Sequence, residues 1–110
     1  MPTLSTGLII AGAYADKLRK TLFAQLSEKV KSGEISPQMV AKAAGDVNSF
    51  LFDILVNDLK LDKGDVVRVR IDYKVKSGEV SFDFDTLRLE VFKRVPDDEV
   101  SEVVKRKLKK

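Results

Sequence analysis

Two runs of alternating apolar and polar residues, separated by Ser77-Gly78, constrain the fold more than any other feature of this chain. In Val66–Val75 the odd-numbered residues are apolar, and in Val80–Phe84 the even-numbered residues are apolar. Each run therefore has one apolar face, because side chains alternate between the two faces of a strand. Two such runs joined by a two-residue turn predict a β-hairpin. The expected cross-strand pairs are Val75–Val80, Tyr73–Phe82 and Ile71–Phe84.

The apolar residues move from even to odd positions after Phe84, at Leu87, Leu89 and Val91. One extra residue near Asp85-Thr86, a β-bulge, would return these side chains to the apolar face. We therefore predict one long bulged strand over Val80–Arg94, in which Leu87 lies opposite Val69. A tight turn at Asp85-Thr86 is the alternative interpretation.

Apolar residues at every fourth position predict a helix that begins near Ala13. The stripe consists of Tyr14, Leu18, Leu22, Leu26 and Val30. Most neighbouring lysine and arginine residues fall outside it, as expected for a helix with one buried side. Ser32-Gly33 ends the helix, since glycine readily adopts the left-handed cap conformation. Upstream, Leu8–Ile10 is either a short buried strand or the first turn of this helix.

A second helix is predicted to begin at Ser36-Pro37, because serine is a favoured N-cap and proline fits the first helical position. It extends to about Leu59, and its expected core stripe is Val40, Ala43, Val47, Phe50, Ile54 and Leu55. Phe52 and Val56 lie off this stripe, so a second apolar side needs a cover, from this fold or from another subunit. The two helices form an antiparallel helical hairpin over about residues 13–60.

A C-terminal helix over about residues 97–110 is predicted to open at Pro96, with acidic residues in its first turn. Its apolar seam is Val100, Val103, Val104 and Leu108, and its basic end is Lys105, Arg106, Lys107, Lys109 and Lys110. The seam is short and needs a partner surface. The predicted fold class is α+β, in one domain of 110 residues. The helical hairpin packs on an antiparallel β-hairpin over about residues 66–94, with a short N-terminal strand if Leu8–Ile10 is extended.

The composition excludes several classes of function. The chain has no Cys and no His, so it lacks thiolate chemistry, the most frequent general base and the most frequent metal ligand. We therefore expect no enzyme, no cofactor and no small-molecule substrate. The longest apolar run, Leu8–Ala15, is too short for a membrane span, and no signal-peptide pattern precedes it. We expect a cytoplasmic protein without a membrane partner. Charged residues make up 34% of the chain, a balance typical of thermophile proteins.

The polar face of the hairpin is predicted to be cationic, although the net charge is only +3. Its members are Arg68, Arg70, Lys74 and, beyond the bulge, Arg88 and Arg94. With one extra residue in the bulge, Arg88 lies opposite Arg68, and like charges in that position repel unless water or an anion separates them. Single-stranded nucleic acid binds to cationic tracks that also offer apolar platforms for bases. Candidate platforms are Tyr14, Phe52 and Phe92, with Lys17 as a further cation. A solvated charged face is the alternative.

Three carboxylates gather in the same hairpin, at Asp72, Asp83 and Asp85. Such a group could hold a magnesium ion. The expected register places Arg70 opposite Asp85, with Lys74 nearby, so cross-strand ion pairing explains most of this charge. We assign no metal site to this group.

Three segments, Leu4–Arg19, Val56–Arg68 and Asp83–Leu87, resemble an archaeal family, the ThermoDBP-related single-stranded-DNA-binding proteins. The similarity spans nearly the whole chain. The resemblance implies binding of single-stranded DNA or RNA without an OB-fold, in a hydrophobic cleft flanked by basic residues. It also implies a homo-oligomer, dimer or tetramer, whose subunits share the nucleic-acid path. The short C-terminal helix differs from the long dimerising helix of the best-known member.

The sequence thus favours sequence-independent binding of single-stranded nucleic acid. Arg68, Arg70, Lys74 and Arg88 would contact phosphates, while Tyr14 or Phe52 would offer bases an apolar surface. The alternative is a structural or protein-interaction module that forms homo-oligomers and binds no nucleic acid. Its support is the second apolar side of the middle helix and the C-terminal seam.

Overall fold

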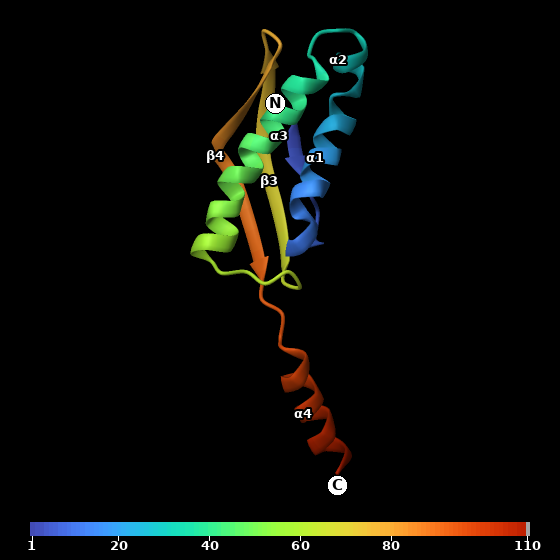
Figure 1. The fold of residues 1–110 in the computed structure, drawn as a ribbon, viewed down its shortest axis with the longest axis vertical. Helices are drawn as coiled ribbons and strands as arrows, with labels where there is room; N and C mark the ends of the chain where they lie inside the picture. Colours follow the sequence, from blue (N-terminus) through green and yellow to red (C-terminus); the bar gives the residue numbers. More distant parts are fainter. Residues whose placement is uncertain (110) are drawn as a thin grey trace.

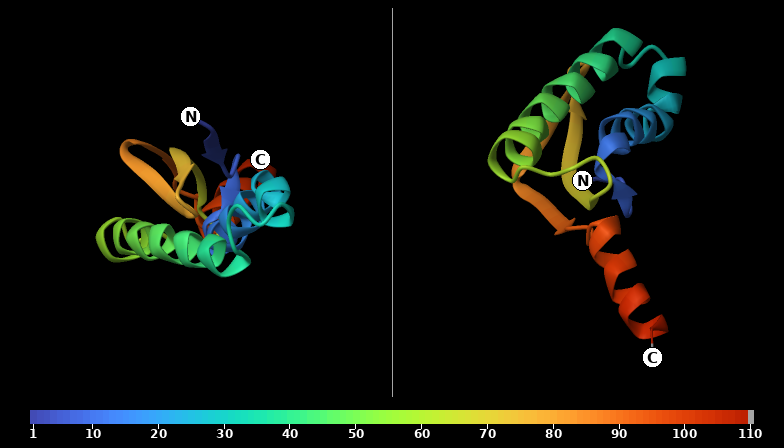
Figure 2. Two further views of the ribbon diagram at one scale, coloured as in Figure 1. Left: turned by 90° about the horizontal axis from the view of Figure 1, so that it is seen from above. Right: turned by 60° about the horizontal axis from the view of Figure 1, so that its bottom comes forward.

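The computed structural model describes residues 1–109 and has two layers, a four-stranded antiparallel sheet and helices that cover one of its faces (Figures 1 and 2). This arrangement confirms the predicted α+β class. The strands are β1 (Thr3–Ser5), β2 (Ile9–Ile10), β3 (Val66–Lys76) and β4 (Glu79–Phe92). The helices are η1 (3₁₀, Ala11–Ala13), α1 (Tyr14–Gln25), α2 (Ser27–Lys31), α3 (Pro37–Phe52), η2 (π-helical, Asp53–Asp58) and α4 (Asp97–Leu108).

Strand β3 lies at the centre of the sheet and pairs with every other strand. It pairs with β4 along one edge, and with β1 and β2 in succession along the other. Thr6 joins β1 to β2: its backbone N–H donates to the carbonyl of Val69, and its hydroxyl accepts from the Val69 N–H, both at 3.0 Å. Gly7 then turns the chain with a φ of +65°, a conformation that glycine adopts without strain. The sequence predicted the extended Ile9–Ile10 segment as one of two alternatives, but it did not predict β1.

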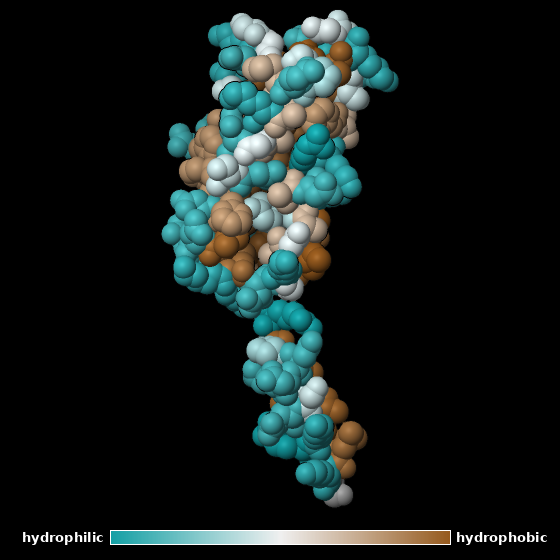
Figure 3. Space-filling model, in the orientation of Figure 1, coloured by the Kyte–Doolittle hydropathy of each residue, from teal (hydrophilic) through white to brown (hydrophobic). Residues whose placement is uncertain are grey.

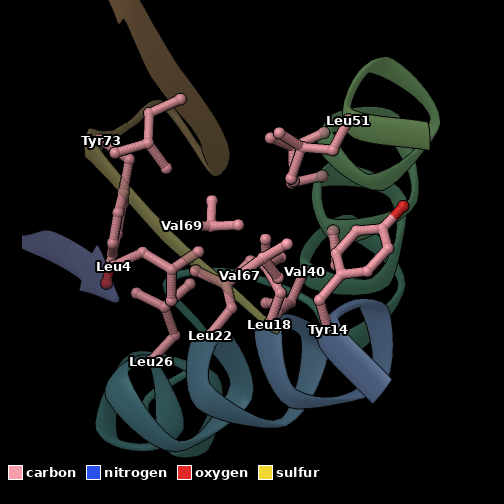
Figure 4. Packing of buried hydrophobic residues seen from close by; sticks show 14 of the residues in the cluster. Leu4, Tyr14, Leu18, Leu22, Leu26, Val40, Leu51, Val67, Val69 and Tyr73 are labelled. Atoms are coloured by element: carbon pink, nitrogen blue, oxygen red, sulfur yellow. The ribbon is translucent and has the colours of Figure 1, made fainter. Parts of the chain in front are cut away.

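The helical hairpin agrees with the predicted pattern in most respects. The stripe from Tyr14 to Leu26 is buried against β3, as Figure 4 shows. Ser36 caps α3, since its hydroxyl oxygen accepts a hydrogen bond from the Met39 N–H at 3.2 Å. One core position was predicted wrongly. Leu51 is fully buried and Phe50 is 46% exposed. Leu51, four residues after Val47, faces the sheet, whereas Phe50, three residues after Val47, does not.

The hairpin turn is confirmed, with Val75 opposite Val80 and Tyr73 opposite Phe82. Ser77 and Gly78 both have positive φ, at 54° and 76°, which is the twist that a two-residue hairpin turn requires. Tyr73 is buried, and its hydroxyl donates to the Gln25 side chain at 2.7 Å, so the hairpin is also joined to α1.

The bulge in β4 is larger than the sequence predicted. Asp72 pairs with Asp83 and Arg70 with Arg88, so two steps along β3 correspond to five along β4, an excess of three residues. Three extra residues change the parity as one would, so the pattern predicted the correct faces. The predicted pairing of Leu87 with Val69 is nevertheless wrong, since Leu89 lies opposite Val69. Figure 1 shows β4 bending beside its label.

The Thr86 hydroxyl bridges the two strands at this bulge. It accepts a hydrogen bond from the Asp72 N–H at 2.9 Å and donates to the carbonyl of Asp83 at 2.6 Å. It therefore satisfies backbone groups that the interrupted ladder would otherwise leave without partners.

Helix α4 extends away from the two layers (Figures 1 and 2). The molecule is consequently elongated, with extents of 67 × 26 × 21 Å. All of the α4 residues are exposed, including Val100 and Val103 on its apolar seam. Lys110, which the sequence assigned to the basic end of this helix, lies outside the described residues.

Replacing Thr86 by valine tests the hydroxyl bridge. Thr86→Val keeps the shape of the side chain but leaves the Asp72 N–H without its acceptor, so we expect a loss of about 1–3 kcal/mol in the free energy of unfolding. Urea unfolding followed by circular dichroism measures this loss. Thr21→Val, at a half-buried position of α1 where the hydroxyl makes no side-chain hydrogen bond within residues 1–109, is the control and should change stability by less than about 0.5 kcal/mol. Equal losses in both variants would contradict the bridge.

Candidate nucleic-acid interface

The face of the sheet opposite the helices is open, and it carries most of the predicted cations. The core-facing residues of β3 are buried, while the alternate residues point to the open face. By this alternation and the β3–β4 pairing, the charged residues of the open face are Arg68, Arg70, Asp72, Lys74 and Lys76 from β3, and Glu79, Asp83, Arg88 and Glu90 from β4. The face is therefore mixed in charge rather than uniformly basic.

Glu90 neutralises part of the cationic track. Its carboxylate accepts two hydrogen bonds from Arg68, at 2.7 and 2.8 Å, and one from Arg70 at 3.1 Å. The hydrogen bonds from Arg68 hold the pKa of Glu90 below its ordinary value, and the same interaction raises the pKa of Arg68. Arg68 is thus held in a bidentate ion pair, which leaves it less available to a ligand than the sequence suggested.

The like-charge pair exists, but it involves a different arginine. The three-residue excess in β4 places Arg88 opposite Arg70, and Glu90 opposite Arg68. The expected pairing of Arg88 with Arg68 is therefore wrong. Arg70 shares the Glu90 carboxylate, whereas no carboxylate within residues 1–109 lies within ion-pairing distance of Arg88. Arg88 is consequently the arginine of this face that is most available to an anion.

An apolar row crosses the open face where β4 ends. Ile10 of β2 pairs with Val66, and Val66 pairs with Phe92. Ile10 is 53% exposed and Phe92 is 49% exposed, so both present apolar surface beside the cations. Phe92 was predicted as a platform for bases, and this geometry suits that role.

The other predicted platforms do not lie on the open face. Tyr14 is only 6% exposed and belongs to the core, so its assignment as a platform is wrong. Burial raises the pKa of its hydroxyl. Phe52 is 51% exposed, as predicted, but it lies on α3 in the helical layer, and Lys17 is exposed on α1 in the same layer. The structure therefore does not group Lys17 or Phe52 with the cations of the sheet.

A second aromatic surface, not predicted from the sequence, lies between α3 and β4. The rings of Phe50 and Phe84 lie 4.8 Å apart between α3 and β4, and each residue is 46% exposed. Both were predicted as core, because each follows the apolar pattern of its element. The signal that could have found them is the bulge, since Phe84 is the last residue before the parity changes. Figure 3 shows apolar surface gathered over the C-terminal part of α3.

Arg94 has a structural role in addition to its charge. Its side chain pairs with Asp97 at the start of α4, and its backbone N–H donates to Asp65 at 2.7 Å. The Asp65 side chain is buried and also accepts from the Asp62 N–H at 2.9 Å. The two backbone hydrogen bonds hold the pKa of Asp65 below its ordinary value. Asp65 thereby joins the loop before β3 to the end of β4.

The three predicted carboxylates are separated by other contacts. Asp72 accepts a hydrogen bond from the Thr3 hydroxyl at 2.5 Å, and Asp83 accepts one from the Asp85 N–H at 3.1 Å. The expected pairing of Arg70 with Asp85 is wrong, because Arg70 lies opposite Arg88. Within residues 1–109, no cluster of three or more acidic side chains is arranged to hold a metal ion.

Comparison with known proteins identifies the family. The model of the ThermoDBP-related family of archaea matches residues 4–81, and the chain belongs to this family. No curated protein matches the chain. No helix among residues 1–109 is long and apolar enough to cross a membrane.

Two solved structures share the fold. A crystal structure of apeThermo-DBP-RP2 bound to single-stranded DNA dT10 is 55% identical, with a TM-score of 0.91 over 96% of this chain. This chain spans only 49% of the length of that protein chain. A crystal structure of pfuThermo-DBP-RP1 is 30% identical, with a TM-score of 0.75 over 96% of this chain and 67% of its own. The fold is therefore that of the family.

Acid unfolding tests the Asp65 contacts. Because the pKa of Asp65 is lower in the folded protein than in the unfolded chain, its ionised form adds stability at neutral pH. That contribution disappears as the pH falls through the folded-state pKa. We expect Asp65→Asn to melt at a lower temperature than the wild type at pH 7, and this difference to shrink at pH 3. Asp58→Asn, at an exposed carboxylate, is the control and should leave the melting temperature at pH 7 close to that of the wild type. A constant difference across pH would contradict the assignment.

Proposed function

We propose that this chain binds single-stranded DNA along the open face of its sheet, chiefly through the phosphate backbone and without a requirement for a particular sequence. The observation that carries the proposal is the relative that is 55% identical and was crystallised with single-stranded DNA dT10. The open face supports it, because cations and exposed apolar side chains lie together there. We propose likewise that the chain is a binding protein rather than an enzyme and that it acts in the cytoplasm. Single-stranded RNA is the alternative ligand.

Each group on the open face has a distinct part in this proposal. Arg88 and Lys74 contact phosphates directly, since no carboxylate within residues 1–109 pairs with either. Arg70 contributes to the same phosphates while it shares Glu90. Arg68 donates two hydrogen bonds to Glu90, so its main part is to hold the Glu90 carboxylate in place, and its contact with DNA is secondary. Phe92 and Ile10 offer bases an apolar surface at the end of the track.

The salt dependence of binding tests the role of Arg88. Each neutralised phosphate of single-stranded DNA contributes about −0.7 to the slope of log K against log salt concentration. We expect Arg88→Ala to weaken binding of labelled dT10 and to reduce that slope by about 0.7, as measured by fluorescence anisotropy at several salt concentrations.

Lys31→Ala is the matched control, because it removes one exposed cation from α2 on the helical side. It should change neither the affinity nor the slope. Equal effects of both variants would show that only overall charge matters. Failure of the wild type to bind dT10 at low salt would overturn the proposed function.

A second candidate function, self-association, rests on α4. Its apolar residues are exposed, and its charges are divided, with acidic residues in the first turn and basic residues in the last. The acidic residues are Asp97, Asp98 and Glu99, and the basic residues are Lys105, Arg106 and Lys107. Two copies of α4 packed antiparallel would bury both seams and bring each acidic turn against a basic turn. We propose that a second copy of this chain covers α4 and that the protein is a homo-oligomer. This contact supports a protein-interaction role whether or not DNA binds.

A substitution on the seam tests this pairing. We expect Val104→Lys to reduce the molar mass in solution to that of one chain, 12.3 kDa, because it buries a charge in the apolar contact. Light scattering after size-exclusion chromatography measures the mass. Glu102→Lys places the same side chain on the other side of α4 and should leave the oligomer intact. A wild-type protein with the mass of one chain would contradict self-association.

A further inference from the structure

The β-bulge of β4 opens a polar cavity on the open face. The cavity has a volume of about 360 Å³. It is lined by Thr3 of β1, Arg70, Ile71 and Asp72 of β3, and Asp85, Thr86 and Arg88 of β4. It exists because the three additional residues of β4 bend this strand away from β3 at Ile71. A cavity of this size can hold one small planar ligand.

Two of the four charged side chains that line the cavity are already engaged. Arg70 pairs with Glu90, and Asp72 accepts a hydrogen bond from Thr3. The other two, Arg88 and Asp85, have no side-chain hydrogen-bond or ion-pair partner within residues 1–109. They line one cavity but form no ion pair with each other. The cavity therefore presents one guanidinium and one carboxylate that do not pair with each other and are available to hydrogen-bond a ligand.

The charges of this cavity disfavour an anion inside it. A phosphate can contact the exposed Arg88 at the outer edge of the cavity, but one that entered the cavity would meet the carboxylates of Asp72 and Asp85, which repel it. A cation would meet the two guanidinium groups. The ligand that satisfies both free groups is uncharged, with hydrogen-bond acceptors on one edge and donors on another.

Among the bases of DNA, guanine fits this description best. Its O6 and N7 atoms accept a bidentate hydrogen bond from arginine, the most frequent specific contact to a base. Its N1–H and N2–H groups lie side by side and match the two oxygens of a carboxylate, which only accepts. Thymine offers one N–H between two acceptors, and cytosine and adenine each offer a single amino group.

We propose that the cavity beside the β4 bulge is a guanine-selective subsite, in which Arg88 donates to O6 and N7 and Asp85 accepts from N1–H and N2–H. This inference rests on the proposed binding of single-stranded DNA. Elsewhere the track remains indifferent to sequence, so one guanine strengthens binding without being required for it.

Oligonucleotides that differ at one position test the subsite. We expect the wild type to bind dT10 with a single central dG about tenfold more tightly than dT10 itself, by competition anisotropy. Replacement of that dG by 7-deazaguanine, which lacks the N7 acceptor, or by hypoxanthine, which lacks the N2 amino group, should each remove much of the gain. Equal gains from a central dA or dC would overturn the assignment to guanine.

Two variants assign the contacts to particular side chains. The Asp85→Ala variant should bind the oligonucleotides with a central dG and a central hypoxanthine equally well. Its binding of dT10 should be unchanged or stronger, because a negative charge has been removed. In Arg88→Ala the 7-deazaguanine substitution should have no effect. The Asp85 carboxylate has no partner within residues 1–109, so its removal should not unfold the protein.

The outcomes separate this inference from the proposed function. If the wild type binds dT10 and gains nothing from guanine, the subsite is wrong and the proposed function stands. If it binds neither oligonucleotide at low salt, both are wrong. If Asp85→Ala retains the full preference for guanine, the role of Asp85 is wrong.

Discussion

Strand β3 is the constraint on which the rest of the structure depends. Every other strand pairs with it, and the helices pack on the side that carries Val67, Val69, Ile71 and Tyr73. A shift of one residue in its register would turn these side chains toward water and the charged residues into the core. Because that exchange is so unfavourable, the strict alternation of β3 determines which face is covered and which is open. The position of the cations on one uncovered surface is therefore a consequence of how the core is built.

The bulge in β4 interrupts this regular scaffold and produces the polar cavity of the open face. Without the three additional residues, the ladder would continue past Asp83 and pair Arg70 with Asp85, an ordinary cross-strand ion pair. The insertion moves Asp85 out of the ladder and brings Arg88 opposite Arg70 instead. Glu90 offsets part of the resulting repulsion through its bond to Arg70. The arrangement leaves Arg88 and Asp85 without protein partners in residues 1–109, and both are exposed, so a ligand would replace the water that solvates them.

Much of the fold could be predicted from the sequence because its local signals agree with one another. The alternation in β3, the turn at Ser77-Gly78 and the cap at Ser36-Pro37 each depend on neighbouring residues, and each is confirmed. The site was harder to predict, because it depends on the number of residues in a bulge. Parity distinguishes odd insertions from even ones but not one residue from three, so the pattern predicted the correct faces and the wrong partners for Arg68 and Arg88. Tyr14 is a different case, because the helical stripe already placed it on the buried side of α1, and its burial follows that pattern rather than the platform assignment.

The charge of the open face is best understood from its ion pairs rather than from its number of arginines. A guanidinium that already holds a carboxylate must give up those hydrogen bonds, at least in part, before it binds a phosphate, and this exchange reduces the gain. In the proposed complex, Arg68, with two hydrogen bonds to Glu90, would contribute orientation, whereas Arg88 would contribute attraction. On the proposed function, a surface of this kind would neutralise few phosphates and would obtain its remaining affinity from apolar contacts, which salt screens little. Phe92 and Ile10, in register across β3, are placed to supply them. The apolar side chains of Ile10 and Phe92 would thus supply the affinity that Arg70 and Arg88 alone do not. The register of β3 places both groups on the same face.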